Sequence, residues 1–195
     1  METLPKNEYK QEEEEEEDSD SLMSVTKHKI VFVGDEGVGK TVIFSRITDN
    51  TFNEVYEPSI GVDYMSKIII FRGKSVKLQM WDTSGQEKYK NLITSYIKYS
   101  SIVFLVYDVS VKATFDNIPK WITFIKTIEN TIIVLCGNKT DLSNREVKKE
   151  EGETLAQKEG IQFFEVSAKT DDNIKNMFYN AFVDLPTFAE NNMNK

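Results

Sequence analysis

One eight-residue stretch constrains this chain more than any other: GDEGVGKT at residues 34–41, a glycine, four residues, and then Gly-Lys-Thr. The apolar run at residues 30–33 has the pattern of a buried strand, and residues 40–47 have that of a helix. Glycines at such a turn let backbone amides curl around phosphates, while Lys40 can reach the outer phosphates and the Thr41 hydroxyl can bind magnesium. The stretch therefore predicts a phosphate-binding turn, which kinases, ATPases and GTPases share.

Downstream of this turn, apolar runs of strand length alternate with amphipathic stretches. Residues 67–71 and 76–81 predict an antiparallel hairpin with a turn at Gly73. Because alternating strands and helices build a mainly parallel sheet covered on both faces, we expect an α/β fold with six strands and about five helices, whose ligands gather outside the carboxyl ends of the strands. Further strands are expected at residues 102–107, 132–136 and 163–166, and apolar helix stripes at Phe115, Ile118, Ile122 and Ile125 and at Ile174, Met177, Phe178, Ala181 and Phe182.

Two loops that follow late strands carry groups suited to reading a base. The first is NKTD at residues 138–141, on the same sheet edge as the phosphate turn. The Asp141 carboxylate can accept hydrogen bonds from N1 and the exocyclic amino group of guanine, a donor pair that adenine lacks. The second loop, SAK at residues 167–169, can offer a backbone amide to guanine O6. Together these loops predict a guanine-nucleotide site, whereas a kinase or ATPase would leave both unexplained.

The run DTSGQ at residues 82–86 begins where the strand through Trp81 ends. Here Asp82 can hold magnesium through water, the Gly85 amide can sense a γ-phosphate, and Gln86 can orient the attacking water. A strand-end turn cap is the alternative role for Asp82. These positions predict slow hydrolysis of GTP.

The irregular segment 51–61 is expected to close over magnesium. Its Ser59 hydroxyl is a candidate magnesium ligand. Phe52 and Tyr56 either cover phosphate and base or pack within the loop, and the sequence leaves both alternatives open.

Acidic residues are concentrated at the start of the chain. Residues 1–26 hold ten acidic and two basic residues, which accounts for the formal net charge of −8, and the remainder balances 22 acidic with 22 basic residues. The six consecutive glutamates at residues 12–17 repel one another, so we expect residues 1–26 to be a disordered acidic tail. The neutral remainder gives no electrostatic reason to expect nucleic-acid binding.

The remaining composition favours a cytoplasmic protein. Cys136 is the single cysteine and is expected to be a buried strand thiol, no apolar run approaches the roughly 20 residues of a membrane span, and the chain does not begin like a signal peptide. His28 is expected to precede the first strand and to have no ligand partners. Magnesium brought by the nucleotide is the only metal expected.

Taken in order, GDEGVGKT, PSIG, WDTSGQE, GNKTD and SAK resemble the five guanine-nucleotide motifs of the Ras superfamily. IGVDY, KYKNL and LVYDVS are similar to segments that distinguish Rab proteins, and LITSYIKYS and GNKTDLSNREV are similar to the Golgi-associated Rab branch. The resemblance implies a P-loop NTPase G domain over residues 27–186, followed by a short tail at 187–195. It also implies a vesicular-transport switch that binds GTP or GDP with Mg²⁺ and recruits effectors in the GTP state.

The same resemblance implies an exchange factor and a GTPase-activating protein as partners. It further implies that Tyr64, Trp81 and Tyr96 are an aromatic triad that faces effectors, with ordinary core packing as the alternative.

Three positions depart from the resembled family. Ser59 replaces the usual Thr, which keeps the hydroxyl but removes a methyl group, and Ser84 replaces the usual Ala. Glu36 occupies a position near the γ-phosphate, where its carboxylate either repels phosphate and obstructs an activating protein or points to solvent. A hydrolysis-deficient guanine-nucleotide scaffold is therefore the alternative function, and Gln86 argues against it.

The chain ends NNMNK, without the cysteines that Rab proteins use for prenylation, and Glu2 excludes amino-terminal myristoylation. Membrane association is therefore expected to be indirect or to need an anchor that this sequence lacks, at the cytosolic face of Golgi or vesicle membranes.

The sequence thus assigns three sets of site residues. Lys40 and Gln86 are the expected catalytic residues, and Thr41, Ser59 and Asp82 the expected magnesium ligands. The expected nucleotide-binding residues are Glu36, Gly37, Val38, Gly39, Lys40, Thr41, Val42, Phe52, Tyr56, Ser59, Gly85, Asn138, Lys139, Asp141, Ser167, Ala168 and Lys169.

Overall fold

A computed structural model describes residues 25–51, 62–83 and 90–189, apart from the side chains of residues 90, 91 and 189. Its six strands are β1 (Thr26–Val33), β2 (Val62–Phe71), β3 (Lys74–Thr83), β4 (Ile102–Asp108), β5 (Ile132–Asn138) and β6 (Gln162–Glu165). The helices in this part of the chain are α1 (Lys40–Asp49), α2 (Lys90–Ile97), α3 (Lys112–Asp116), α4 (Ile118–Ile128), α5 (Lys149–Glu159), α6 (Ile174–Ala181) and α7 (Pro186–Ala189).

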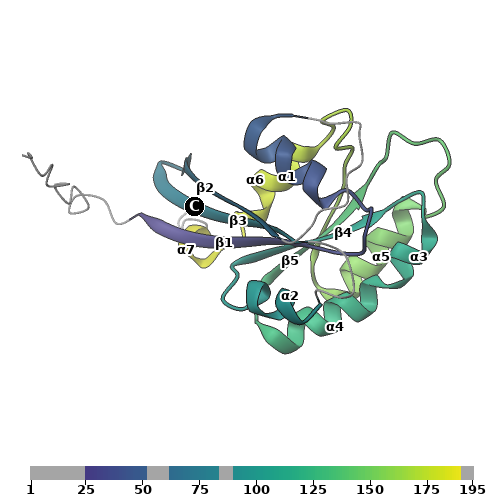
Figure 1. Ribbon diagram of the computed structural model, residues 1–195, viewed down its shortest axis with the longest axis horizontal. Helices are drawn as coiled ribbons and strands as arrows, with labels where there is room; N and C mark the ends of the chain where they lie inside the picture. The colour runs from purple at the N-terminus through teal and green to yellow at the C-terminus, as the bar shows by residue number, and fades with distance from the viewer. Residues whose placement is uncertain (1–24, 52–61, 84–89, 190–195) are drawn as a thin grey trace, which may run out of the picture.

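The strands form one sheet in the order β2-β3-β1-β4-β5-β6 (Figure 1). The β2 and β3 strands pair antiparallel, and the other neighbours pair parallel. The predicted hairpin and the mainly parallel six-stranded sheet are therefore confirmed. In such a sheet the loops after β1, β4 and β5 emerge at the same edge.

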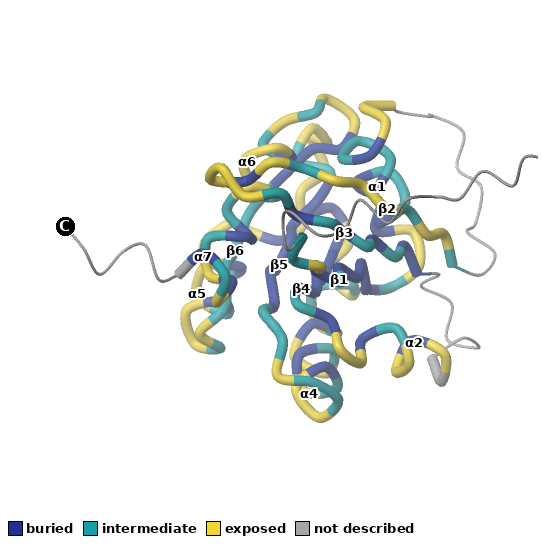
Figure 2. Tube along the Cα trace, turned by 90° about the vertical axis from the view of Figure 1, so that its left-hand side faces the viewer, coloured by how far each residue is buried: buried dark blue, intermediate teal, exposed yellow. Residues whose placement is uncertain are grey.

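Helices cover both faces of the sheet. In Figure 1, α1 and α6 lie on one side, and α2 and α4 lie on the other. Ile43 of α1 and Met177 of α6 belong to one buried cluster, whereas Ile97 of α2 and Ile122 of α4 belong to the second. Both predicted stripes face the sheet, on opposite sides, and burying each such side chain contributes roughly 1.5–3 kcal/mol. In Figure 2 the buried residues, in dark blue, are concentrated in interior strands such as β1, β4 and β5, whose residues belong to both clusters.

The described part of the chain holds seven helices, where about five were expected. The stripe at residues 115–125 is divided between α3 and α4 at Asn117, and Pro119 stands in the first turn of α4, where proline favours a new helix start. Helix α5 gives little apolar signal because it approaches the sheet through Gly152, where a Cβ would lie 2.5 Å from the Phe163 ring.

Both ends of the described fold are packed against its core. Strand β1 begins at Thr26, so the expectation that His28 precedes the first strand was wrong. His28 is buried, and its Nδ1 lies 3.1 Å from the Ser101 hydroxyl. At the other end, Phe188 of α7 is buried against Phe71, so packing continues past residue 186. None of the described helices is long and apolar enough to cross a bilayer.

Candidate functional site

The phosphate turn connects the end of β1 to α1, as the sequence predicts. Two of its glycines have positive φ and close neighbours. A Cβ at Gly34 (φ +139°) would lie 2.2 Å from the Val106 carbonyl oxygen, and one at Gly39 (φ +96°) would lie 2.3 Å from Asn138 Nδ2. Since any side chain would be strained and would collide at both positions, glycine is required there.

Lys40 is folded back onto the phosphate turn itself. Its ammonium donates to the carbonyl oxygens of Gly34 at 3.0 Å and Asp35 at 2.7 Å. Burial lowers the pKa of Lys40 to about 8, while the carboxylates of Asp82, Asp35 and Glu36 oppose that shift. The cation is thus held at the centre of the turn by weak neutral acceptors, which anionic phosphate oxygens can replace.

Asp82 and Thr41 meet beside this cation. The Thr41 hydroxyl donates to Asp82 Oδ2 at 2.6 Å, while the buried Oδ1 has no hydrogen-bond partner among the described residues. Burial raises the pKa of Asp82 to about 6, against the effects of the Thr41 hydrogen bond and the Lys40 charge. A hydroxyl, and a carboxylate with one unsatisfied buried oxygen, are suitable ligands for a hard divalent cation, so these residues fit magnesium.

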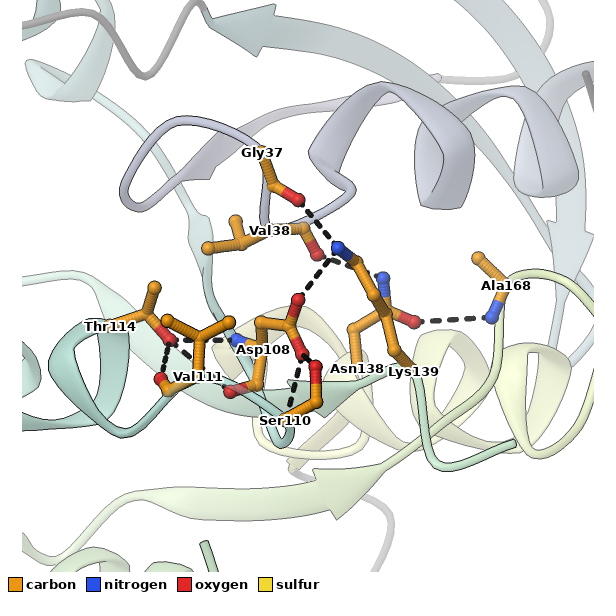
Figure 3. A network of polar contacts seen from close by, with 9 residues as sticks. All are labelled: Gly37, Val38, Asp108, Ser110, Val111, Thr114, Asn138, Lys139 and Ala168. Carbon is orange, nitrogen blue, oxygen red and sulfur yellow. Dashed lines mark hydrogen bonds and ion pairs between the residues drawn. The ribbon is translucent and has the colours of Figure 1, made fainter. Parts of the chain in front are cut away.

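Asn138 joins the base loops to the phosphate turn (Figure 3). Its Nδ2 donates to the Val38 carbonyl oxygen at 2.9 Å, and its Oδ1 accepts from the Ala168 amide at 3.1 Å. All three groups are buried. One side chain therefore holds three separate loops in a fixed arrangement. It also occupies the Ala168 amide, one of the amides of the SAK loop expected to face guanine O6.

Lys139 bridges the same loops from the outside. Its ammonium lies 2.8 Å from the Gly37 carbonyl oxygen and 2.6 Å from Oδ2 of the buried Asp108 (Figure 3). The other Asp108 oxygen accepts from the Ser110 amide and hydroxyl. Sequence reasoning missed Asp108. The available signal was its position at the carboxyl end of β4, the strand between those that lead into the phosphate turn and NKTD.

Asp141 is oriented by the second base loop. The Ser167 hydroxyl donates to Asp141 Oδ1 at 2.5 Å and accepts from the Thr170 amide at 3.1 Å. Asp141 and Lys169 are solvent-exposed, whereas Ser167 is buried. A fixed hydroxyl thus aims an accessible carboxylate, the arrangement expected for reading a base at the surface of the protein.

A protein-family model described as the Ras family matches residues 29–186 of the chain. This chain belongs to the Ras family. Members of that family are small GTPases, which bind guanine nucleotides, generally with Mg²⁺, and generally interact with exchange factors, GTPase-activating proteins and effectors. The matched range includes both base loops, the phosphate turn and the Thr41–Asp82 pair.

Arg46 is another residue of this Ras-family site that sequence reasoning missed. From α1, its Nε donates to the Ala168 carbonyl oxygen at 2.7 Å and its Nη2 to that of Lys169 at 2.8 Å. No local pattern signals this role, because the two partners lie more than 120 residues further along the chain. Arg46 fixes the SAK loop against the helix that begins at Lys40.

The other predicted site residues of this Ras-family chain fall into two groups, those that the structure describes and those outside the described residues. Glu36 and Gly37 are exposed on the phosphate turn, and Val42 is half-buried in α1 beside the first core cluster. Five predicted residues lie outside the described parts of the chain, and their roles stay predictions: Phe52, Tyr56, Ser59, Gly85 and Gln86.

Proposed function

We propose that this Ras-family GTPase is a Rab-type switch that hydrolyses GTP slowly and recruits effectors of vesicular transport in its GTP-bound form. Residues 27–186 are the G domain of this proposal. GTP and magnesium order the segments 52–64 and 82–97, and loss of the γ-phosphate releases them. The work of the protein lies in that change of shape, at the cytosolic face of Golgi or vesicle membranes.

The aromatic group at Tyr64, Trp81 and Tyr96 is the observation that carries the Rab-type assignment. The Tyr64 and Trp81 ring centroids lie 4.5 Å apart, and those of Trp81 and Tyr96 lie 5.3 Å apart. Tyr64 is 47 % exposed, whereas Trp81 and Tyr96 are partly buried against the second core cluster. The three rings thus form a continuous apolar surface anchored in the core, suited to an effector that reads the switch.

In the proposed reaction, Lys40 and the amides of the phosphate turn stabilise the transferred phosphate, and Gln86 orients the attacking water. Thr41, Ser59 and Asp82 hold magnesium, which supplies neutralisation of phosphate charge when bound. Asp141 and the 167–169 loop select guanine. Among the described residues no arginine finger in cis is identified, so intrinsic turnover should be on the order of 10⁻⁴ per second, the scale of unassisted Ras-type hydrolysis.

A single-turnover assay with preloaded GTP tests hydrolysis. The wild type should form GDP slowly, a Rab-type activating domain should accelerate it, and Gln86→Leu should abolish the acceleration. The alternative is a scaffold that binds guanine nucleotide without hydrolysing it, and it is motivated by Glu36 and Ser84. No GDP from the wild type over many hours, with or without the activating domain, would favour the scaffold.

A pulldown with the GTP-locked Gln86→Leu protein tests effector recruitment. Tyr64→Ala in this background should remove the captured partners. The matched control is Ile70→Ala, because Ile70 is 79 % exposed on the same strand and lies outside the aromatic group. Equal capture by both variants would contradict the proposed effector surface.

A further inference from the structure

Two side chains at the amino end of α4 donate hydrogen bonds to the carboxylate of Asp35, which lies in the phosphate turn. These two hydrogen bonds are called the Asp35 grip. Asn117 Nδ2 donates to Asp35 Oδ2 at 2.8 Å, and Trp121 Nε1 donates to Asp35 Oδ1 at 2.8 Å. Asn117 occupies the N-cap position of α4 without a side-chain capping hydrogen bond, and Trp121 lies one turn further along that helix. Both oxygens of one carboxylate therefore receive donors from the same helix end.

The Asp35 grip reduces the repulsion expected between the Asp35 carboxylate and bound phosphates. A carboxylate beside bound phosphates repels them, because both are anions and the site is partly shielded from water. Two N–H donors and the positive end of the α4 dipole stabilise the Asp35 carboxylate on the side of α4. Charge-assisted hydrogen bonds of this kind also resist movement of the loop that carries the acceptor.

The same residue also touches the catalytic lysine. The Asp35 carbonyl oxygen accepts from the Lys40 ammonium at 2.7 Å, so its backbone faces the phosphate site while its side chain faces α4. Trp121 is in turn fixed by the second core cluster and by an edge contact with Phe124, with ring centroids 6.1 Å apart. A continuous chain of contacts thus runs from the core through α4 to the phosphate turn.

We propose that Asn117 and Trp121 are positioning residues, which act through Asp35 to hold the phosphate turn in its nucleotide-binding shape. The inference rests on the proposed guanine-nucleotide site and adds to it a support from α4. Loosening the grip should let bound nucleotide escape faster, without altering the groups that touch it.

An exchange of donor and acceptor tests the grip most sharply. Asn117→Asp places two carboxylates face to face and should accelerate GDP release about tenfold. In the double variant D35N/N117D, the amide of residue 35 can donate to the new carboxylate while its oxygen still accepts from Trp121. Release should then return to within about twofold of wild type. Failure of this rescue would overturn the proposal, because a disturbance of packing at the start of α4 alone predicts no recovery.

Trp121→Phe keeps an aromatic ring and removes only the indole donor. It should accelerate GDP release about fivefold, and adding it to Asp35→Ala should cause no further change. Thr127→Ala is the matched control, because this exposed α4 hydroxyl donates only to the Phe124 carbonyl oxygen of its own helix. Unchanged release in W121F, or effects of W121F and D35A that simply add, would overturn the proposal.

A nucleotide-independent measurement separates this inference from the proposed function. The chain has two tryptophans, so amide NMR should show two indole N–H signals, and W121F identifies the one from Trp121. Asp35→Ala should shift the Trp121 signal more than the Trp81 signal. An unmoved Trp121 signal would overturn the grip even if GDP binds normally. A wild type that binds no guanine nucleotide would instead refute the proposed function.

Discussion

The two ends of the proposed nucleotide site differ in how their polar groups are used. At the base end, Asn138 bridges the Val38 carbonyl and the Ala168 amide, and Ser167 aims Asp141, so these loops are joined to one another before a base arrives. At the phosphate end, Lys40 is bound to carbonyls of its own loop, and one buried oxygen of Asp82 has no partner in the described parts of the chain. The base end is preorganised, and the phosphate end is held by contacts that ligands must replace.

The pKa values of Lys40 and Asp82 also indicate that the phosphate end depends on its ligands. Burial lowers the pKa of Lys40 to about 8 and raises that of Asp82 to about 6, so both charges are destabilised where a phosphate and a cation are expected. Charged ligands would relieve both penalties at once. The fold therefore stabilises base recognition in advance and leaves the phosphate end dependent on its ligands.

The largest expected effect follows from removing the base-reading carboxylate. Asp141→Asn replaces an acceptor by a donor opposite the guanine N–H groups, so the preference for GTP over ATP should fall on the order of 10³-fold. Competition binding with both nucleotides measures the ratio. Asp116→Asn, an exposed acid at the end of α3, is the control. An unchanged preference in D141N would show that the guanine assignment is wrong.

Gly39 lies where the phosphate end meets Asn138 of the base end, and a substitution there should disturb both ends. A Cβ there would collide with Asn138 Nδ2, so Gly39→Ala should weaken GDP binding by about 100-fold or more. At Gly37 φ is also positive, but a Cβ meets nothing within 4 Å, so Gly37→Ala shares the backbone strain without the collision. Titration calorimetry should therefore show a clearly smaller loss for G37A. Equal losses would mean that strain alone explains the effect.

The Asp82 pKa predicts a pH dependence at the phosphate end. The folded pKa, about 6, lies above the ordinary value of 3.8, so the folded state holds this proton more tightly. The resulting stability is fully present below about pH 4 and is lost as the pH rises through about 6.

Chemical denaturation of the nucleotide-free protein can measure this loss. Between pH 4 and pH 7 the free energy of unfolding of the wild type should fall by about 1–3 kcal/mol relative to that of Asp82→Asn, which lacks the titrating group. Excess magnesium and GDP should remove most of the difference. Parallel pH profiles for the two proteins would contradict the buried, unsatisfied carboxyl.

The smallest effect is expected from the support of the base end. Arg46→Ala removes two hydrogen bonds to the SAK loop, so GDP should dissociate about three- to fivefold faster, with guanine preference retained. Arg46→Lys should recover part of the loss, because its ammonium can still donate to one carbonyl oxygen of the SAK loop. Stopped-flow release of labelled GDP measures both variants, and a loss of guanine preference would contradict a supporting role.

Sequence reasoning succeeded where function depends on local backbone. The phosphate turn, the β2–β3 hairpin and the strands leading to NKTD follow from short patterns of glycine and apolar residues, and the structure confirms these elements. It did not give the bounds of α5, whose close approach through Gly152 needs no apolar stripe, and it was wrong at His28, which lies inside β1. Those failures come from packing, which a local pattern does not encode.

By itself the sequence determined the ligand-facing loops of this protein, because glycine conformation and strand-to-helix turns are properties of a few adjacent residues. Only the tertiary structure decided what holds those loops. Asp35 meets Trp121 across 86 residues, Lys139 meets Asp108 between two strands, and Arg46 reaches Ala168 across 122 residues. Such pairs have no spacing rule, since they form only after the sheet has brought distant strand ends to one edge.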